Sequence, residues 1–439
     1  NITLKAEKYL DQDDILLFIG PRQAGKTTIL KQLQGKLEHD GETVFSLNLE
    51  DPDYLKLLDE SPKNLFKIFT FDNTRRTVVI LDEVQYLKNP SNFLKYFYDE
   101  YKGKIKILAS GSSAFYIDQH FKDSLAGRKK IFQVLTLSFQ EFLNFKNEPE
   151  LAKKDLKKIS LSEKEKIEIL YREYMIYGGY PRIVLAPAEE KIDLLHELAY
   201  SYIKKDIFEA HIRQDQIFYK LIKILATQVG NLLNTSELAN TLGVSKTSID
   251  HYITVMQKTF HIHLIRPFFQ NIRKELTKMP KIFFSDMGLR NFFTGEFKNF
   301  EMRNDQGQLL ENAVFRELLE ENQIDNIHFW RTADGHEIDF IINKKNAYEV
   351  KTNNTIEQLT YNNVNLAFLH CCCRVRWLAC TNHGVHIMFL TLLKRIKPRE
   401  SISHTHTYIH STREVILTSM YDWMLLSVGA SIMRKRRFS

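Results

Sequence analysis

Residues 15–28 read ILLFIGPRQAGKTT, and this stretch decides the fold of the N-terminal part of the chain. Its first five residues form an uninterrupted apolar run, which is typical of a strand buried on both faces. The run leads directly into the loop GPRQAGKTT and then into residues 29–37, whose spacing predicts a helix. The loop matches the pattern GxxxxGK[ST] in the strand–loop–helix order that this pattern requires, so the sequence predicts a phosphate-binding P-loop.

The chemistry of this loop predicts ATP and Mg²⁺ as its ligands. Its glycines let backbone N–H groups curl around phosphate, and the following helix adds the positive end of its dipole. Lys26 is expected to reach the β- and γ-phosphates, while the hydroxyl of Thr27 is expected to ligate Mg²⁺. The predicted nucleotide-binding residues are Gly20, Pro21, Arg22, Gln23, Ala24, Gly25, Lys26, Thr27 and Thr28.

A second apolar strand, residues 77–81 (TVVIL), ends in the two carboxylates of Asp82 and Glu83. In P-loop proteins such a strand lies beside the P-loop strand, which would bring Asp82 to the Mg²⁺ ion. Glu83 is then placed to polarise the attacking water as a general base. Two carboxylates after a strand are often only a solvated turn, but their position about 55 residues downstream of a P-loop favours the catalytic interpretation.

Two further residues are candidates for catalytic roles. Ser110 follows the apolar strand 105–109 (IKILA) and is expected either to contact the γ-phosphate or the attacking water, or to cap a helix from a small-residue turn. Arg128 is expected either to face the nucleotide of its own or a neighbouring subunit, or to be an ordinary surface arginine. The role at a neighbouring subunit would require the chain to oligomerise.

Taken together, the segments GPRQAGKTT, VVILDEVQ, ASGSS, SLAGR and LTLSFQEFL resemble a group of prokaryotic ATPases of the AAA superfamily. The segments YGGYPRIVL (177–185) and KMPKIFFSDMGLR (278–290) extend this resemblance over roughly residues 1–352. It implies ATP binding, ATP hydrolysis and a nuclease-like fold in a C-terminal domain that was long catalogued as of unknown function. The expected fold class is therefore multidomain α/β, with a P-loop AAA-type ATPase core over residues 1–150.

Two mainly helical units are expected after this core. Residues 151–214, rich in Lys, Glu and Leu at helical spacing, predict a helical lid over the nucleotide. Within residues 215–275, the segment 235–256 has the apolar spacing of a helix-turn-helix, with Gly243 at the turn and Ser245 as the cap of a second helix over 246–257. This predicts a winged helix. Its outer face would contact DNA, but it has few basic residues, and winged helices in ATPases also serve as lids or protein contacts.

The segment 276–352 predicts a small α/β nuclease-like domain with a second divalent metal. A glutamate in a helix over 309–320, an aspartate in a strand hairpin and then Glu-x-Lys form the pattern of the PD-(D/E)xK nuclease fold. Asp339 and Glu349 would hold the metal through hard oxygen ligands, and Glu311 would extend the shell. Lys351 would orient the attacking water. The alternative is a hairpin with one charged, solvated face, and nuclease folds without cleavage activity are common.

Residues 353–439 differ in character from the rest of the chain. They hold 11 of its 61 Lys and Arg residues, 4 of its 54 Asp and Glu residues and all four cysteines, so the net charge of +7 belongs to this tail and the body is neutral. Bulk basicity is therefore no argument for nucleic-acid binding by the body. Three adjacent cysteines do not match usual zinc-ligand spacing, and we interpret roughly residues 360–439 as aberrant, frameshift-like sequence.

No run of about 18 apolar residues predicts a membrane span, and the absence of cysteine before residue 353 fits a cytoplasmic protein. The chain begins with Asn1 rather than Met, as a fragment or a processed form would. Two functions remain open. One is an ATPase that acts on or with DNA through its winged-helix and nuclease-like parts. The other is a nucleotide-dependent switch that binds a protein partner and has no nuclease activity.

Overall fold

The computed structural model describes residues 2–72, 74–112, 125, 127–154, 159–269, 271–332, 334–344, 346–351, 374–381 and 384–386. For residues 351, 374–381 and 384–386 the description covers the backbone alone. Ser113, Ser124 and Ala126, which belong to two of the quoted motifs, lie outside these residues, as does most of the tail that we interpret as aberrant. Among the described residues, no helix is both long and apolar enough to cross a membrane.

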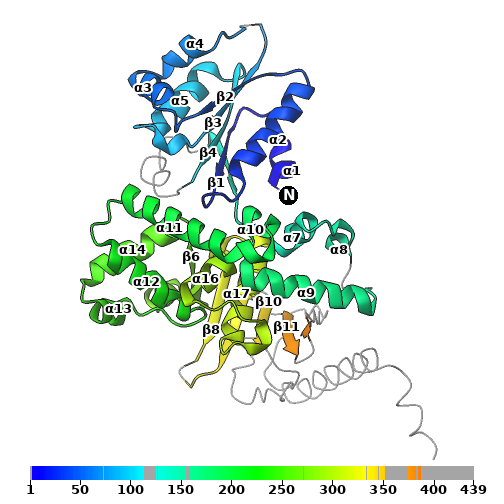
Figure 1. The fold of residues 1–439 in the computed structure, drawn as a ribbon. Helices are drawn as coiled ribbons and strands as arrows, with labels where there is room; N and C mark the ends of the chain where they lie inside the picture. Colours follow the sequence, from blue (N-terminus) through cyan, green and yellow to red (C-terminus); the bar gives the residue numbers. More distant parts are fainter. Residues whose placement is uncertain are drawn as a thin grey trace, which may run out of the picture. The chain divides into compact units, whose positions relative to one another are not determined.

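The N-terminal part is a parallel five-stranded sheet with the strand order β2-β3-β4-β1-β5 (Figure 1). All of its strand pairs run parallel, so the carboxyl ends of the strands meet at one edge. That edge carries the P-loop after β1, and Asp82 at the end of β3. The expectation that the strand ending in Asp82 lies directly beside the P-loop strand is wrong, because β4 lies between β3 and β1. The strands are β1 (Ile15–Ile19), β2 (Thr43–Asn48), β3 (Thr77–Asp82), β4 (Ile105–Gly111) and β5 (Lys129–Gln133).

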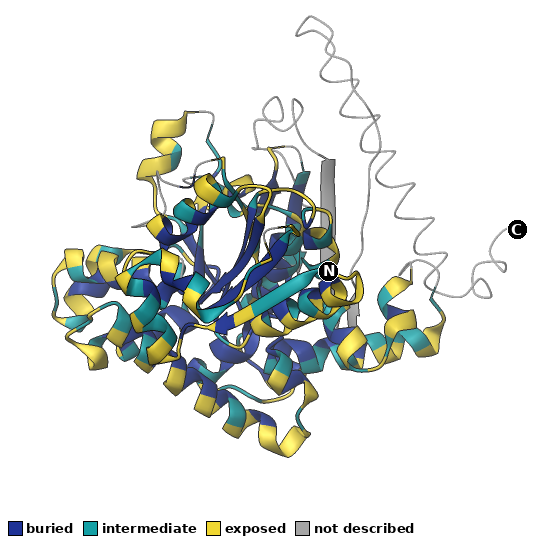
Figure 2. Ribbon diagram, turned by 90° about the horizontal axis from the view of Figure 1, so that it is seen from above, coloured by how far each residue is buried: buried dark blue, intermediate teal, exposed yellow. Residues whose placement is uncertain are grey.

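Helices cover both faces of this sheet because alternate strand residues point to opposite sides. Leu16, Phe18 and Leu108 pack against α1 and α2 in one buried cluster. Leu17 and Ile107 pack in another against α5 and the segments around α3 and α4. Figure 2 shows the inner strands of the sheet as buried and the outer helix faces as exposed, whereas the edge strands β2 and β5 are mostly of intermediate burial or exposed. The helices are α1 (Ile2–Glu7), α2 (Lys26–His39), α3 (Pro52–Glu60), α4 (Leu65–Ile68) and α5 (Pro90–Tyr101).

A run of helices follows the sheet. Ser138 and Ser160 each accept a hydrogen bond from the backbone of a glutamate three residues on, and each glutamate reaches back, so capping boxes start α7 and α9. The helices of this run are α7 (Phe139–Phe145), α8 (Pro149–Lys153), α9 (Leu161–Tyr177), α10 (Pro181–Leu185) and α11 (Lys191–Glu209).

The two helices of the expected helix-turn-helix are present. Asn234 caps α13, since its Oδ1 accepts from the backbone of Ser236 and Glu237. Ser245 caps α14 by accepting from Ser248 N at 3.1 Å, as the sequence predicts. The elements in this region are α12 (Asp215–Thr227), α13 (Thr235–Leu242), α14 (Lys246–Lys258), β6 (Ile262–Pro267), α15 (Ile272–Thr277) and β7 (Lys281–Phe284).

A second sheet joins this region to the rest of the described chain. It has seven strands in the order β12-β11-β10-β9-β8-β6-β7. β6 pairs antiparallel with β7 and parallel with β8, so the sheet contains strands from both sides of the domain boundary expected at residue 275. That boundary stays a prediction. The remaining elements are α16 (Met287–Thr294), α17 (Gln306–Glu321), β8 (Ile327–Arg331), β9 (Glu337–Ile342), β10 (Asn346–Lys351), β11 (Arg374–Thr381) and β12 (Gly384–His386).

One buried core extends from Tyr180 to Tyr348, so the α10–α14 helices and the second sheet share their hydrophobic interior. Short 3₁₀ turns connect several elements of the chain: Pro62–Asn64, Val84–Tyr86, Ala188–Glu190, Phe300–Met302 and Ile324–Asn326.

The segments YGGYPRIVL and KMPKIFFSDMGLR meet at the buried carboxylate of Asp286. Its Oδ2 accepts from Gly179 N at 2.8 Å, and its Oδ1 accepts from Leu289 N at 3.0 Å, which caps α16. Gly178 has a φ of 77°, and a Cβ there would lie 2.1 Å from Asp286 Oδ1. Only glycine fits this joint. These two motifs therefore hold α9 against α16, which is a structural role.

Candidate nucleotide site

The P-loop crosses from β1 to α2 with little room for side chains at its start. A Cβ on Gly20 would lie 1.8 Å from the carbonyl oxygen of Val134, which follows β5. Gly25 precedes the helix with a φ of 102°, and Gln23 also has a positive φ of 53°. The first N–H groups of α2 have no partner within the helix, which makes this end of the helix suited to phosphate.

Lys26 is the first residue of α2, and its side chain is buried. Its Nζ donates to the carbonyl oxygens of Gly20 at 3.1 Å and Pro21 at 2.9 Å, so the ammonium lies inside the curve of the loop. Burial lowers the pKa of Lys26 to about 8, against the opposing effect of the Glu83 carboxylate. The amine is thus positioned where a phosphate bound to this loop would contact it.

Asp82 joins the P-loop helix to the neighbouring strands. Thr27 Oγ1 donates to Asp82 Oδ2 at 2.7 Å, and the hydroxyl of Ser110 donates to Asp82 Oδ1. Asp82 and Ser110 lie side by side because β3 pairs with β4 in the register Leu81↔Ala109. The Thr27 hydroxyl and the Asp82 carboxylate are the oxygen ligands that Mg²⁺ prefers, and they would hold it together with phosphate and water.

Glu83 adopts a left-handed backbone, with φ 59° and ψ 47°, which is uncommon outside glycine. Its N–H donates to Ser110 Oγ at 3.0 Å, and its carboxylate accepts from the side-chain amide of Gln85. Gln85 also donates to Ser112 Oγ at 2.9 Å. The backbone turn and Gln85 therefore fix the carboxylate beside the end of the sheet. Sequence reasoning missed Gln85, although it stands inside the quoted motif VVILDEVQ.

Arg128 lies at the other edge of the sheet from the P-loop. Its carbonyl oxygen accepts from Ile15 N at 2.9 Å, at the start of β1, whereas the P-loop follows the end of β1. A five-residue strand is roughly 16 Å long. The guanidinium donates to Asp99 Oδ1 at 2.9 Å and lies over the ring of Tyr98. The expectation that Arg128 faces the nucleotide of its own chain is therefore wrong, and a role at a neighbouring subunit stays a prediction.

The nuclease-like residues are brought together, but around a lysine that sequence reasoning missed. Lys281, in β7, is 2% exposed and pairs with Glu311 at 2.9 Å and with Glu337, while Asp339 Oδ1 is 3.9 Å away. Burial alone would lower the pKa of Lys281, but these three carboxylates raise it. Burial raises the pKa of Glu311 to about 8, although Lys281 opposes this. The cluster is thus a buried ion network.

The rest of the predicted second metal site is only partly defined. Asp339 Oδ2 accepts from Val350 N at 2.7 Å, so β9 and β10 hold it in place. Burial raises the pKa of Asp339, and the neighbouring Glu349 adds to this. The side chain of Lys351 lies outside the described residues. Across the described part of the chain, no group of three or more His, Cys, Asp or Glu side chains is arranged to hold a metal.

Comparisons with protein families match three separate parts of the chain. Residues 12–143 match an AAA domain. Residues 12–143 form a P-loop domain of the AAA type. Residues 168–299 match a domain of unknown function (DUF8612), and residues 306–370 match another (DUF4143). The last match extends past residue 352, where we expected the resemblance to end.

Relatives in distant microbes share most of the chain. An uncharacterized protein of Haemophilus influenzae is 27% identical over 348 residues, which cover 77% of this chain and 81% of that protein. An uncharacterized protein of Methanocaldococcus jannaschii is 27% identical over 380 residues, covering 81% of both. The matched lengths of 348 and 380 residues are far longer than residues 12–143, so the likeness to these relatives extends beyond the AAA domain match.

Solved structures with a similar arrangement include replication proteins. The Aeropyrum pernix ORC2 protein in ADPNP–ADP complexes is 11% identical, with a TM-score of 0.37 over 73% of this chain and 93% of that one. The replication initiator DnaA, bound to AMPPCP and single-stranded DNA, is 18% identical, with a TM-score of 0.30 over 58% and 86%. At such low TM-scores these likenesses carry no argument about function.

Proposed function

We propose that this protein binds ATP with Mg²⁺ and hydrolyses it. The observation that carries the proposal is the convergence of Thr27, Asp82, Ser110 and Glu83 at the edge of the sheet where the P-loop lies. The loop and Lys26 would bind the phosphates, and Thr27 with Asp82 would hold Mg²⁺. Mg²⁺ would neutralise charge that develops on the phosphates. Glu83 would accept the proton of the attacking water.

Replacing Lys26 by alanine tests this proposal. Lys26→Ala is expected to lower Mg²⁺-dependent ATP turnover by about 10²-fold or more, because a preorganised charge at the phosphates is lost. Lys31→Ala, on the exposed side of the same helix α2, is the matched control and keeps wild-type turnover. Phosphate release and calorimetric titration with MgATP measure both effects. Equal turnover in Lys26→Ala and wild type, or no nucleotide binding by wild type, would refute the proposal.

We further propose that ATP use serves an action on or with DNA, through the connection between β6 and β7. The helix-turn-helix gives limited support for a DNA contact. On α14 the acidic side chain of Asp250 is exposed near Lys246 and His251, and its negative charge would repel phosphate. The β6–β7 connection is more basic. It exposes three cationic side chains on or beside α15, Arg273, Lys274 and Lys278, and the exposed Arg266 of β6 donates to the carbonyl oxygen of Leu276 in that helix. Clustered Lys and Arg side chains bind phosphates of nucleic acid without reading their sequence.

Reversing two of these charges tests the DNA contact. Arg273→Glu/Lys274→Glu is expected to weaken binding of a 30-base-pair duplex about tenfold or more at low salt, and to reduce the slope of log K against log salt by about 2. Lys63→Glu/Lys67→Glu makes the same charge change at exposed positions of the AAA-type domain and is the control. Fluorescence anisotropy across a salt series measures both. Identical affinities for the two double variants would count against this interface.

The alternative is a nucleotide-dependent switch that binds a protein partner and has no nuclease activity. Two observations favour it over cleavage. Lys281 neutralises carboxylates that a metal would need, and α15 with its flank also exposes Ile272, Leu276 and Met279. Exposed apolar side chains close together suit a protein contact. Metal-dependent nicking of plasmid DNA that disappears in Asp339→Ala would instead favour the DNA-directed function with a working nuclease site.

A further inference from the structure

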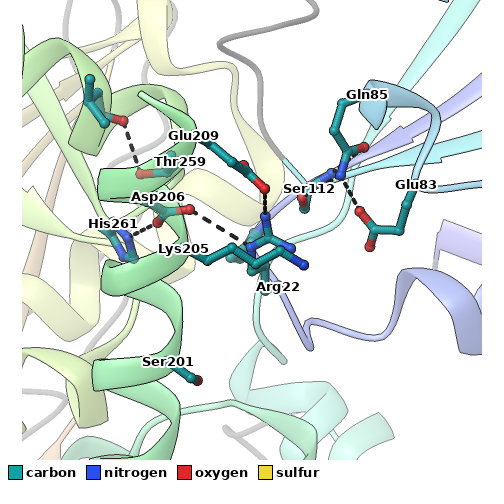
Figure 3. A network of polar contacts seen from close by, with 12 residues as sticks. Arg22, Glu83, Gln85, Ser112, Ser201, Lys205, Asp206, Glu209, Thr259 and His261 are labelled. Carbon is teal, nitrogen blue, oxygen red and sulfur yellow. Dashed lines mark hydrogen bonds and ion pairs between the residues drawn. The ribbon is translucent and has the colours of Figure 1, made fainter. Parts of the chain in front are cut away.

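Arg22 of the P-loop forms ion pairs with α11, a helix from the middle of the chain. The guanidinium of Arg22 forms an ion pair with Glu209, and its Nε lies 3.9 Å from Asp206 Oδ1 (Figure 3). Both carboxylates come from the last turn of α11, more than 180 residues along the chain. The three side chains are no more than 12% exposed. This contact is therefore largely withdrawn from water, where ion pairs are screened less.

Further polar contacts connect α11 to the second sheet. Asp206 Oδ2 lies 2.6 Å from His261 Nε2, within hydrogen-bond distance. His261 stands between α14 and β6, where its N–H donates to Met256 O at 2.9 Å. Its carbonyl oxygen accepts from Ser285 N, just after β7, at 3.0 Å. A continuous set of contacts thus leads from the P-loop through α11 to the β6–β7 pair.

The charges in this network are sensitive to anything negative that binds the loop. Burial alone would lower the pKa of Arg22, but Glu209 and Asp206 raise it, so the guanidinium stays charged. Burial raises the pKa of Glu209, and Arg22 opposes this. A guanidinium has five N–H donors in a planar fork and binds phosphate as readily as carboxylate. Phosphates on the P-loop would compete with α11 for the same donors.

We propose that Asp206 and Glu209 are positioning residues of the nucleotide site: they hold Arg22, and bound phosphate draws the guanidinium away from them. This proposal rests on the ATP binding proposed above. It makes α11 the element that responds to nucleotide. When phosphate takes Arg22, the last turn of α11 loses its attachment to the P-loop, and the Asp206–His261 pair passes the change to the β6–β7 pair.

A double-mutant cycle on nucleotide affinity tests the proposal. Glu209→Gln is expected to tighten binding of a Mg²⁺ complex of a β,γ-imido ATP analogue about five- to tenfold, because Arg22 becomes available to phosphate. In an Arg22→Gln background the same change is expected to shift the affinity less than about twofold, since no guanidinium is then left for the substitution to release. Asp193→Asn, at the exposed start of α11, removes the same charge and leaves the affinity unchanged.

Hydrogen exchange on the unaltered full chain gives a second test that no folding defect can disturb. Saturating analogue is expected to speed amide exchange in the last turn of α11, residues 206–209, relative to residues 195–200 of the same helix. Unchanged or slower exchange there overturns the proposal, as does an equal Glu209→Gln effect with and without Arg22, which would indicate bare charge repulsion. Absence of any calorimetric binding by the wild type would overturn ATP binding itself and this proposal with it.

Discussion

Glu83→Gln is expected to leave MgATP binding within about threefold of wild type and to lower single-turnover hydrolysis by about 10²–10³-fold. The amide has the size of the carboxylate and keeps an oxygen that accepts from Gln85, so the local contacts survive. It cannot take a proton from the attacking water. The left-handed turn at Glu83 is held by its N–H bond to Ser110, which the substitution does not touch.

The matched control for this prediction is Glu60→Gln, the same change on the exposed end of α3. Quenched-flow hydrolysis with enzyme in excess over ATP isolates the chemical step, and calorimetry reports the affinity separately. A fall in affinity that matches the fall in rate would mean that Glu83 supports binding and not catalysis. A rate within a factor of three of wild type would assign the base to another residue.

Sequence reasoning reached the nucleotide site because its parts follow from local patterns. The apolar run 15–19 and the loop after it specify a buried strand and a phosphate-binding turn, and the structure places β1 and α2 there. The proximity of Asp82 and Ser110 follows from parallel pairing, which aligns the ends of neighbouring strands. Alternation along β9 puts Glu337 and Asp339 on one face, and both point toward Lys281.

Contacts between distant segments were beyond the same reasoning. Arg22 looks like an ordinary loop residue until α11 brings Asp206 and Glu209 to it, and no spacing in a single sequence encodes that pairing. Lys281 belongs to a motif whose role the sequence left open, and its burial depends on how β7 joins the second sheet. Arg128 was expected near its own nucleotide because strand direction was not used: it precedes β5, so it lies at the starting edge.

Lys281→Met is expected to lower the free energy of unfolding by about 3–5 kcal/mol, because the variant leaves buried carboxylates without their partner. Methionine fills a similar volume, so the loss reflects charge more than packing. Lys278→Met, three residues earlier and exposed, is the control and is expected to cost little. Urea unfolding followed by tryptophan fluorescence measures the change, since Trp330 lies in β8 of the same sheet.

The pH dependence identifies the charge as the cause. Glu311 has a pKa of about 8 in the folded protein, and without Lys281 it rises further. An unfolded glutamate titrates near ~4.3, so between that pH and about 8 the folded state binds more protons than the unfolded one, and stability falls as pH rises. The decline continues to higher pH for Lys281→Met than for wild type, because the folded pKa of Glu311 lies higher, and adding Glu311→Gln removes most of the difference. Parallel pH profiles for Lys281→Met and wild type would instead point to lost packing. If Lys281→Met were as stable as wild type, Lys281 would not be needed to neutralise the carboxylates, and they would be free to bind a metal.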